Sequence, residues 1–525
     1  MLHGGAAAQT TPTTGCPQRP LSNAVVKNPL DLTSTNGALK VDFTLRSLKL
    51  PEQFLKECYL YETSSGPVEA PTLRLNPGDQ LELTLTNRLT FVPPAPPVGF
   101  LAHDMAAMPA PGTPHDPCLG GAMVATSTNI HFHGLGIPPK CHQDDVLITG
   151  IENTDPPFSY SFQIPPDHPP GMYWYHPHVH GFTTLQVNGG AAGVLIVGGM
   201  ETVKPEVAGL PERVLVVRQE FENPDSWLAG PNRLTLNFQP ARYRHRLPPI
   251  LQMKPGVKEF WRVANAASQA FLSLQVLFGT TPQNLTLVAL DGVPVRKSVE
   301  VQSIELPPAG RAEFIVTGPP SGQAARLQTA GFDTGPIGPP NPTKELAEIV
   351  ATANAQEPPA FGGGNTIRKP RAPTSADMPL KARVTARRAM YFAEAAAGTN
   401  GPTEFFLTLE GQKPKMFTMS SPPAVVTKVG AVEDWTIANH AGEVHTFHIH
   451  QIHFLFLEVN GKKLTNPEWR DTVIVPAWDG VGPYPTVKLR MDFRDPRIAG
   501  TFVFHCHILD HEDGGMMAKI QVNPK

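Results

Sequence analysis

Long apolar runs are missing from this chain of 525 residues. No stretch approaches the roughly 18 apolar residues that a membrane-spanning helix needs, so we expect no membrane partner. An excess of one charge is also missing, because 43 Lys and Arg residues nearly balance 46 Asp and Glu residues. The net charge of −3 argues against nucleic acid or an anionic membrane surface as partner. The first 20 residues lack a charged and an apolar signal region, although a chain whose leader had been removed would look the same.

Cysteine is scarce, with five residues in the chain. One lies within a histidine cluster described below, and the other four fall in the first third: Cys16, Cys58, Cys118 and Cys141. Four cysteines allow three pairings, and the sequence does not choose among them. One or two disulfides would fit an oxidising compartment, so we expect a periplasmic or secreted protein, with free buried thiols as the alternative.

Sustained helical periodicity is scarce as well. The 58 prolines and 45 glycines punctuate short runs rich in Val, Leu, Thr and Phe, which indicates a mostly β chain. One ten-residue pattern, which ends in an Asn nine residues after a Gly, occurs at 78–87, 256–265 and 430–439. The copies are spaced by about one third of the chain, which predicts an all-β fold of three similar β-sandwich domains.

We place the domain boundaries near 200 and 375, which gives domains at 1–200, 201–375 and 376–525. The segment 356–378 is rich in Pro, Gly and Ala and indicates an exposed linker, and 88–127 indicates a long surface loop. Segments 171–178 and 500–507 share a Gly and two His at matching positions. The middle third has no such segment, so we expect the chemistry in the outer domains.

Histidine is concentrated in four groups of the outer thirds: His131-Phe132-His133, His176-Pro177-His178, His445 to His450, and His505-Cys506-His507 followed by His511. The repeated unit is His-x-His. On a strand, residues i and i+2 face the same side about 6–7 Å apart, so two such imidazoles can reach adjacent metal ions. Imidazole suits copper, which stands highest in the divalent affinity order. A structural zinc site would be a closed tetrahedron without use for paired histidines from distant domains.

The tripeptide around Cys506 predicts the type of chemistry. On an extended backbone, His505 and His507 point to one face and Cys506 to the other. A blue-copper centre needs one Cys, two His and a weak axial Met. His511 and Met516 follow at compact spacing, and His445 is the best candidate for the second imidazole. One tripeptide would thus connect an electron-accepting copper to a copper cluster, which predicts an oxidase.

These four segments resemble the copper-binding motifs of multicopper oxidases, and the whole chain resembles their three-domain laccase-like branch. HCHILDHEDGGMM is most similar to the version in bacterial spore-coat laccases. The resemblance implies three cupredoxin-like Greek-key domains and four coppers per chain. It implies His131 and His448 at the type 2 copper, His133, His176 and His507 at one type 3 copper, His178, His450 and His505 at the other, and His445, Cys506, His511 and axial Met516 at the type 1 copper.

Acidic residues near the cluster are expected, because reduction of dioxygen to water consumes protons. Glu512 matches a proton-relay glutamate of the bacterial laccases that the chain resembles. Asp144 or Asp145 lies where relatives carry an acid beside the type 2 copper, and the extra residues 140–142 leave the choice between them open.

The resemblance implies a laccase-type oxidoreductase, in which a small phenol or aromatic amine donates electrons at the edge of His511 and dioxygen accepts them. The alternative is a metal-ion oxidase for Cu(I), Mn(II) or Fe(II), which keeps Met105, Met108 and Met123 of interest. We expect a monomer. Of the remaining histidines, we expect His180 and His453 to support or pack against the site, and we expect the others in loops or on the surface: His3, His103, His115, His142, His168 and His440.

Overall fold

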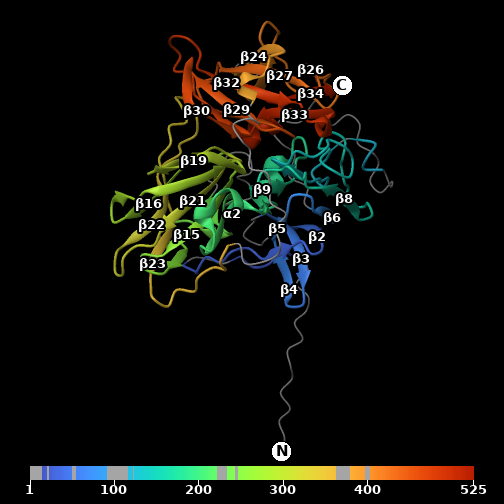
Figure 1. Cartoon of the computed structure of the whole chain (residues 1–525). Coiled ribbons are helices and arrows are strands. Elements are labelled where there is room, and N and C mark those ends of the chain that lie inside the picture. Colours follow the sequence, from blue (N-terminus) through green and yellow to red (C-terminus); the bar gives the residue numbers. More distant parts are fainter. Residues whose placement is uncertain are drawn as a thin grey trace, which may run out of the picture.

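Strands dominate the computed structural model, which describes residues 15–19, 23–49, 55–90, 116–121, 123–221, 233–242, 246–361, 379–396 and 403–525. The strands form six sheets, and each sheet takes its strands from one third of the chain. The sheets therefore make three pairs in chain order. Figure 1 shows the three pairs, coloured blue to teal, green to yellow and orange to red, around a centre where β9 is labelled.

The first pair of sheets has the strand orders β4-β3-β2-β6-β8 and β1-β5-β10-β9-β7. Their bounds are β1 (Asp31–Thr33), β2 (Ala38–Lys49), β3 (Leu55–Thr63), β4 (Gly66–Glu69), β5 (Thr72–Leu75), β6 (Gln80–Arg88), β7 (His131–His133), β8 (Phe158–Gln163), β9 (Gly171–His176) and β10 (Gly193–Val197). Helix α1 (Thr183–Gly189) precedes β10, and α2 (Met200–Val203) and η2 (Pro205–Val207) follow it.

The second pair has the orders β13-β12-β11-β15-β21-β18-β19 and β14-β23-β22-β16-β17, with β20 paired to β16. Their bounds are β11 (Glu212–Glu220), β12 (Arg233–Leu236), β13 (Gln239–Pro240), β14 (Ile250–Met253), β15 (Lys258–Ala266), β16 (Leu272–Phe278), β17 (Thr281–Pro282), β18 (Leu285–Leu290), β19 (Val293–Val301), β20 (Ile304–Leu306), β21 (Arg311–Thr317), β22 (Ala325–Ala330) and β23 (Lys344–Ala351).

The third pair has the orders β25-β24-β27-β32-β29-β30 and β26-β34-β33-β28-β31. Their bounds are β24 (Ala386–Ala396), β25 (Thr403–Leu409), β26 (Val425–Lys428), β27 (Ala431–Asn439), β28 (His445–Ile449), β29 (Phe454–Val459), β30 (Lys462–Arg470), β31 (Thr472–Val475), β32 (Thr486–Phe493), β33 (Gly500–Cys506) and β34 (Met517–Asn523). The short helices here are η4 (Pro379–Lys381), η5 (Pro496–Ile498) and α3 (Leu509–Asp513).

The repeated sequence pattern forms a central strand in each third, namely β6, β15 and β27. Its final Asn has the same role each time, because the buried side-chain amide donates to backbone carbonyls of neighbouring loops: Asn87 to Thr126 and Ile151, Asn265 to Ala270, Leu306 and Pro307, and Asn439 to Glu443 and Pro476. The amide oxygen accepts the N–H two residues further on. The Asn thus lies within one residue of the end of its strand and fixes the loops that follow, an arrangement that supports the predicted repeat.

Each pair of sheets encloses its own apolar core, as sandwich packing requires. A further apolar cluster joins the first two thirds, where Met172 and Trp174 of β9 lie with residues of β10, β11 and β15. The predicted boundary near 200 falls between β10 and β11, and the boundary near 375 falls outside the described residues. The domain limits stay a prediction.

The histidine motifs lie on matching strand pairs of the outer thirds. In the first third β7 pairs antiparallel with β9, and His131 lies opposite His176. In the last third β28 pairs antiparallel with β33, and His448 lies opposite His505. The same local fold therefore presents paired imidazoles from both ends of the chain.

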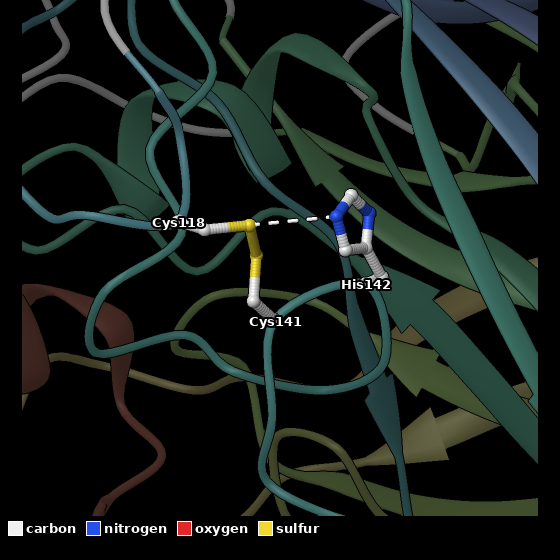
Figure 2. A group of neighbouring side chains, drawn as sticks. All are labelled: Cys118, Cys141 and His142. Atoms are coloured by element: carbon white, nitrogen blue, oxygen red, sulfur yellow. Dashed lines mark hydrogen bonds between the residues drawn. A yellow bond between two sulfur atoms is a disulfide. The ribbon is translucent and has the colours of Figure 1, made fainter.

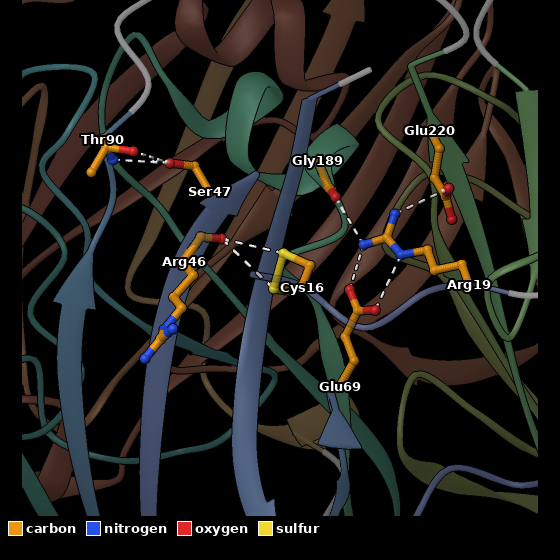
Figure 3. The surroundings of a disulfide bond; sticks show 9 residues. Cys16, Arg19, Arg46, Ser47, Glu69, Thr90, Gly189 and Glu220 are labelled. Atoms are coloured by element: carbon orange, nitrogen blue, oxygen red, sulfur yellow. Dashed lines mark hydrogen bonds and ion pairs between the residues drawn. A yellow bond between two sulfur atoms is a disulfide. The ribbon is translucent and has the colours of Figure 1, made fainter. Parts of the chain in front are cut away.

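The four N-terminal cysteines form two disulfides, Cys16–Cys58 and Cys118–Cys141. Beside the first, the buried guanidinium of Arg19 contacts Glu69, the carbonyl of Gly189 at 2.9 Å and Glu220 of β11 at 3.1 Å, as Figure 3 shows. This arginine therefore fastens the N-terminal segment to the first two thirds of the chain. No helix among the described residues has the length and apolar character that crossing a membrane demands.

Candidate metal centre

The Cys506 group (His445, Cys506, His511) lies in the last third, between β28, the end of β33 and α3. The sulfur of Cys506 is 3.6 Å from Nδ1 of His445 and 3.9 Å from Nδ1 of His511, and the two nitrogens are 3.2 Å apart. Burial alone would raise the pKa of the Cys506 thiol, but hydrogen bonds from both imidazoles lower it to about 6. A thiolate and two imidazole nitrogens therefore face one point, which is the donor set of a soft metal ion.

Met516 is fully buried beside this group. Its N–H donates to the carbonyl of His511, and its carbonyl accepts from the N–H of Cys506. These bonds close the turn after α3 and bring Met516 back to the Cys506 group, where the sequence predicts an axial ligand. Met517 packs instead with Val146 and Val503, in agreement with its predicted packing role.

Two carboxylates that sequence reasoning missed face the outer nitrogens of this group. An oxygen of Glu443 lies 2.9 Å from Nε2 of His511, and an oxygen of Glu394 lies 3.3 Å from Nε2 of His445. Phe405 stacks on the ring of His511 with centroids 4.3 Å apart. The side chain of His511 is 8% exposed, so the Cys506 group lies just beneath the surface.

The other eight predicted histidine ligands gather into one buried cluster between the first and last thirds. The cluster contains three sets of histidines, and within each set the possible ligand atoms lie within 4.8 Å of one another. We name each set by one member: the His131 group (His131, His133, His448), the His507 group (His133, His176, His507) and the His505 group (His178, His450, His505). His133 belongs to both the His131 and the His507 groups, and the ring of His131 stacks on that of His450 at a centroid distance of 3.8 Å, so the three sets adjoin one another.

The cluster fits metal ions better than an apolar or hydrogen-bonded core. Several of its buried ring nitrogens have no hydrogen-bond partner: Nε2 of His131, His176 and His448, Nδ1 of His450, and both nitrogens of His133 and His507. An unpaired buried polar atom costs about 1–3 kcal/mol, so this number of them requires a ligand. Burial, followed by neighbouring imidazoles, lowers the pKa of His131, His133, His178, His448, His450 and His507, so the rings are neutral donors.

The acid beside His131 is Asp144. Its two carboxylate oxygens lie 3.0 Å from Nδ1 of His131, and one of them accepts the N–H of Phe132. Nε2 of His131 is thereby directed at the cluster. Asp145 instead accepts the N–H groups of Leu147 and Ile148 in the next turn, so its carboxylate is directed away from His131.

Gln451 connects this acid to the last third of the chain. Its buried amide donates to Asp144 at 2.6 Å, and its backbone takes a φ of +60°, which is unusual for a residue other than Gly. It also lines a cavity of about 640 Å³ together with His168, His453 and Trp469. Sequence reasoning missed Gln451, since the bond spans 307 positions and leaves no spacing pattern.

Asp471, also missed, supports two proposed ligands. Its carbonyl accepts from Nδ1 of His448 at 2.7 Å, and its carboxylate lies 3.5 Å from Nε2 of His133. The carboxylate is held by two bonds from Arg311 of β21, at 2.7 and 2.6 Å. The middle third, which supplies no histidine to the cluster, therefore fixes it through this buried ion pair.

Glu512 lies between the cluster and α3. Its oxygens are 3.5 Å from Nε2 of His178 and 3.1 Å from Nδ1 of His505. Burial and the neighbouring Asp513 raise the pKa of Glu512 well above its usual value. Asp513 is held in turn by the N–H groups of Thr183 and Thr184 at the start of α1. A buried carboxyl group with a raised pKa thus lies next to two histidines of the His505 group.

The remaining described histidines lie outside the cluster and the Cys506 group. His453 contacts Asp471 and the carbonyl of Asp291, and His180 packs on Phe417, which fits supporting and packing roles. His142 is exposed, and His168 lies in the loop between β8 and β9, so both agree with the expected loop or surface positions, although His168 is buried there at 5% exposure. Pro165 and Tyr173 enclose it. His3, His103, His115, Met105 and Met108 lie outside the described residues.

A strand-rich fold with a thiolate–imidazole group beside a buried imidazole cluster defines a copper oxidoreductase of cupredoxin-like domains. Sequence profiles described as multicopper oxidase match residues 122–201, 212–324 and 388–525, together more than half of the chain. The chain belongs to the multicopper oxidase family. This membership implies copper, dioxygen and a reducing substrate.

Characterised relatives include both laccases and metal oxidases. The chain is 22% identical to the multicopper oxidase mco of Staphylococcus aureus, over 94% of this chain and 91% of the relative. It is 23% identical to a laccase of Bacillus subtilis, over 75% and 79%. Among solved structures, a multicopper oxidase of Campylobacter jejuni described as a metallo-oxidase has a TM-score of 0.65 at 23% identity, covering 97% of this chain and 96% of that one. This likeness confirms the predicted all-β cupredoxin-like fold.

Proposed function

We propose that this protein is a laccase-like multicopper oxidase, which oxidises phenols or aromatic amines by one electron and reduces dioxygen to water by four. The observation that carries the proposal is the position of one tripeptide. The sulfur of Cys506 faces His445 and His511, while His505 and His507 belong to two sets of the buried cluster. Three consecutive residues thus join a site near the surface to the interior cluster.

The proposed arrangement has four coppers per chain. The Cys506 group with Met516 would hold the type 1 copper, the His507 and His505 groups the two type 3 coppers, and His131 with His448 the type 2 copper. Bound copper would supply the one-electron redox chemistry and the binding of dioxygen. The protein supplies neutral imidazoles and a thiolate at fixed positions, so that little reorganisation accompanies electron transfer.

Protons for water formation would come from two buried carboxyl groups on different sides of the cluster. Glu512 contacts His178 and His505, and Asp144 contacts His131. Burial raises the pKa of Asp144 to about 7, so this group can take up and release a proton near neutral pH. Gln451, which donates to Asp144, also lines the cavity, and this supports access of small molecules from that side.

The reductant would meet the protein at His511, whose ring edge lies beside Glu443 just beneath the surface. Glu443 could accept the hydroxyl proton of a phenol as the electron leaves. The same feature favours the second candidate, a metal-ion oxidase, because two carboxylates next to the Cys506 group are donors that a cationic reductant prefers.

Replacement of Cys506 by Ser tests the main proposal. We expect loss of the blue absorption, a fall from about four to about three coppers per chain, and loss of substrate oxidation. Met517→Leu, next to the proposed axial ligand, is the matched control and should keep colour and copper. A blue, active Cys506→Ser enzyme would contradict the proposal.

The reductant class needs a separate comparison. Turnover of a phenol and an aromatic amine should exceed catalysed oxidation of Cu(I), Mn(II) and Fe(II) under air. Preference for a metal ion, lost in a Glu394→Gln, Glu443→Gln variant, would favour the second candidate. We further propose a monomer in the periplasm or outside the cell, since two disulfides fit an oxidising compartment, and sedimentation would test the monomer.

A further inference from the structure

The Cys118–Cys141 disulfide lies at the surface next to an imidazole. Both cysteines are partly exposed and His142 is exposed. Nε2 of His142 lies 3.5 Å from the sulfur of Cys118, as the dashed line in Figure 2 shows. These three residues lie outside the buried cluster and the Cys506 group, and the proposed function does not use them.

The His142 ring is held in place on one face and at its other nitrogen. Nδ1 lies 2.7 Å from the carbonyl of Ser159, to which it donates its proton. The ring stacks on Phe158 with centroids 4.7 Å apart and planes 8° from parallel. The φ of His142 is +66°, a left-handed backbone conformation that turns the side chain back toward the disulfide. These contacts together direct Nε2 of His142 at the sulfur of Cys118.

The two sulfur atoms have different surroundings. Cys118 faces Nε2 of His142, whereas the contact described for the sulfur of Cys141 is the hydroxyl of Thr149 at 3.8 Å. A protonated imidazole stabilises a neighbouring thiolate, and a thiolate so stabilised is the better leaving group in disulfide exchange. Cys118 is thus the sulfur from which a disulfide bond breaks most easily.

We propose that this disulfide is a site of S-thiolation by small thiols, with Cys141 as the modified residue. The thiolate sulfur of the small thiol attacks the sulfur of Cys141 and forms a mixed disulfide. The Cys118–Cys141 bond breaks, its electron pair goes to the sulfur of Cys118, and the imidazolium form of His142, which carries a proton on each ring nitrogen, supplies the proton from Nε2. The small thiol is oxidised and Cys118 is reduced to a thiol.

The Cys16–Cys58 disulfide provides an internal contrast. Cys16 is 7% exposed and Cys58 is 0% exposed, so a thiolate in solution cannot reach either sulfur in the folded protein. Access is a main determinant of exchange, and one protein therefore holds a resistant and a reactive disulfide. Cys141 of the reactive disulfide lies three positions before Asp144, on the loop that brings this acid to His131.

Glutathione added to the copper-loaded protein tests the proposal, with digestion under acid and mass measurement of the cysteine peptides. We expect one glutathione on Cys141, a free thiol at Cys118, and an intact Cys16–Cys58 pair. Absence of an adduct while the protein stays folded, or an adduct mainly on Cys118, would overturn it.

The role of the imidazole is tested with His142→Asn, since Asn tolerates the left-handed backbone. The rate of adduct formation should fall by about three- to tenfold, the size that the Brønsted dependence of thiol exchange supports. His440→Asn is the matched control, because this histidine stacks between Tyr391 and Tyr484 away from sulfur. Copper content checks the fold of both variants, and equal rates in His142→Asn and the original protein would refute the assisting role.

Discussion

Glu57 of β3 is a buried carboxyl group whose effect on stability depends on pH. Its side chain is 0% exposed, and neither carboxylate oxygen has a hydrogen-bond partner among the described residues. Burial raises the pKa of Glu57 to about 8. The folded protein therefore keeps a proton on Glu57 in a pH range where the unfolded chain, with an ordinary glutamate, has lost it.

The sign and size of the effect follow from proton linkage. Below the unfolded pKa of about 4.3 both states hold the proton and Glu57 has no pH-dependent cost. Between that value and about 8 the folded state binds more protons, so the free energy of unfolding falls by about 1.4 kcal/mol per pH unit. The cost is about 1 kcal/mol at pH 5 and about 4.5 kcal/mol at pH 8.

Glu57→Gln removes the ionisation and keeps the shape. Relative to the original protein, the variant should gain roughly 3–4 kcal/mol between pH 5 and pH 8, measured as the difference in unfolding free energy in urea at each pH. Glu62→Gln, an exposed glutamate on the same strand, should show a flat difference. A flat difference for Glu57→Gln as well would refute the reasoning, since it would mean that Glu57 finds a charged or solvated partner.

Two further substitutions test the supports of the metal centre. Gln451→Gly suits the backbone φ of +60° but removes the donor to Asp144, so type 2 copper should be held about 10- to 100-fold less tightly, measured by copper retention and electron paramagnetic resonance. Unchanged retention would contradict a positioning role. Glu443→Gln removes a negative charge next to His511, so the type 1 reduction potential should rise by roughly 50–100 mV in a redox titration. An unchanged potential would show that this charge does not act on the copper, and a lower one would contradict the predicted sign.

Much of the fold could be predicted because the pattern repeats. Apolar and polar residues alternate along 80–88, and the side chains of β6 alternate between buried and partly exposed in the same order. The same sequence pattern forms β15 and β27, which lie in the interior of their sheets. The His-x-His pairs could be located for the same reason, since strand geometry places residues i and i+2 on one side. Disulfide pairing could not be predicted, because it depends on distances between loops rather than on order along the chain.

The supports of the cluster were beyond sequence reasoning for a different reason. Asp144 and Asp145 are adjacent and chemically identical, and only the turn geometry directs one to His131 and the other to the N–H of Leu147. Gln451 and Arg311 act across thirds of the chain, where no local periodicity connects partners. The prediction that the metal-binding residues lie in the outer thirds therefore holds for the candidate ligands, but it does not cover residues such as Arg311 that orient them. Because Arg311 holds the carboxylate of Asp471 next to His133, the middle third helps to position the candidate metal centre even though it supplies none of the candidate ligands.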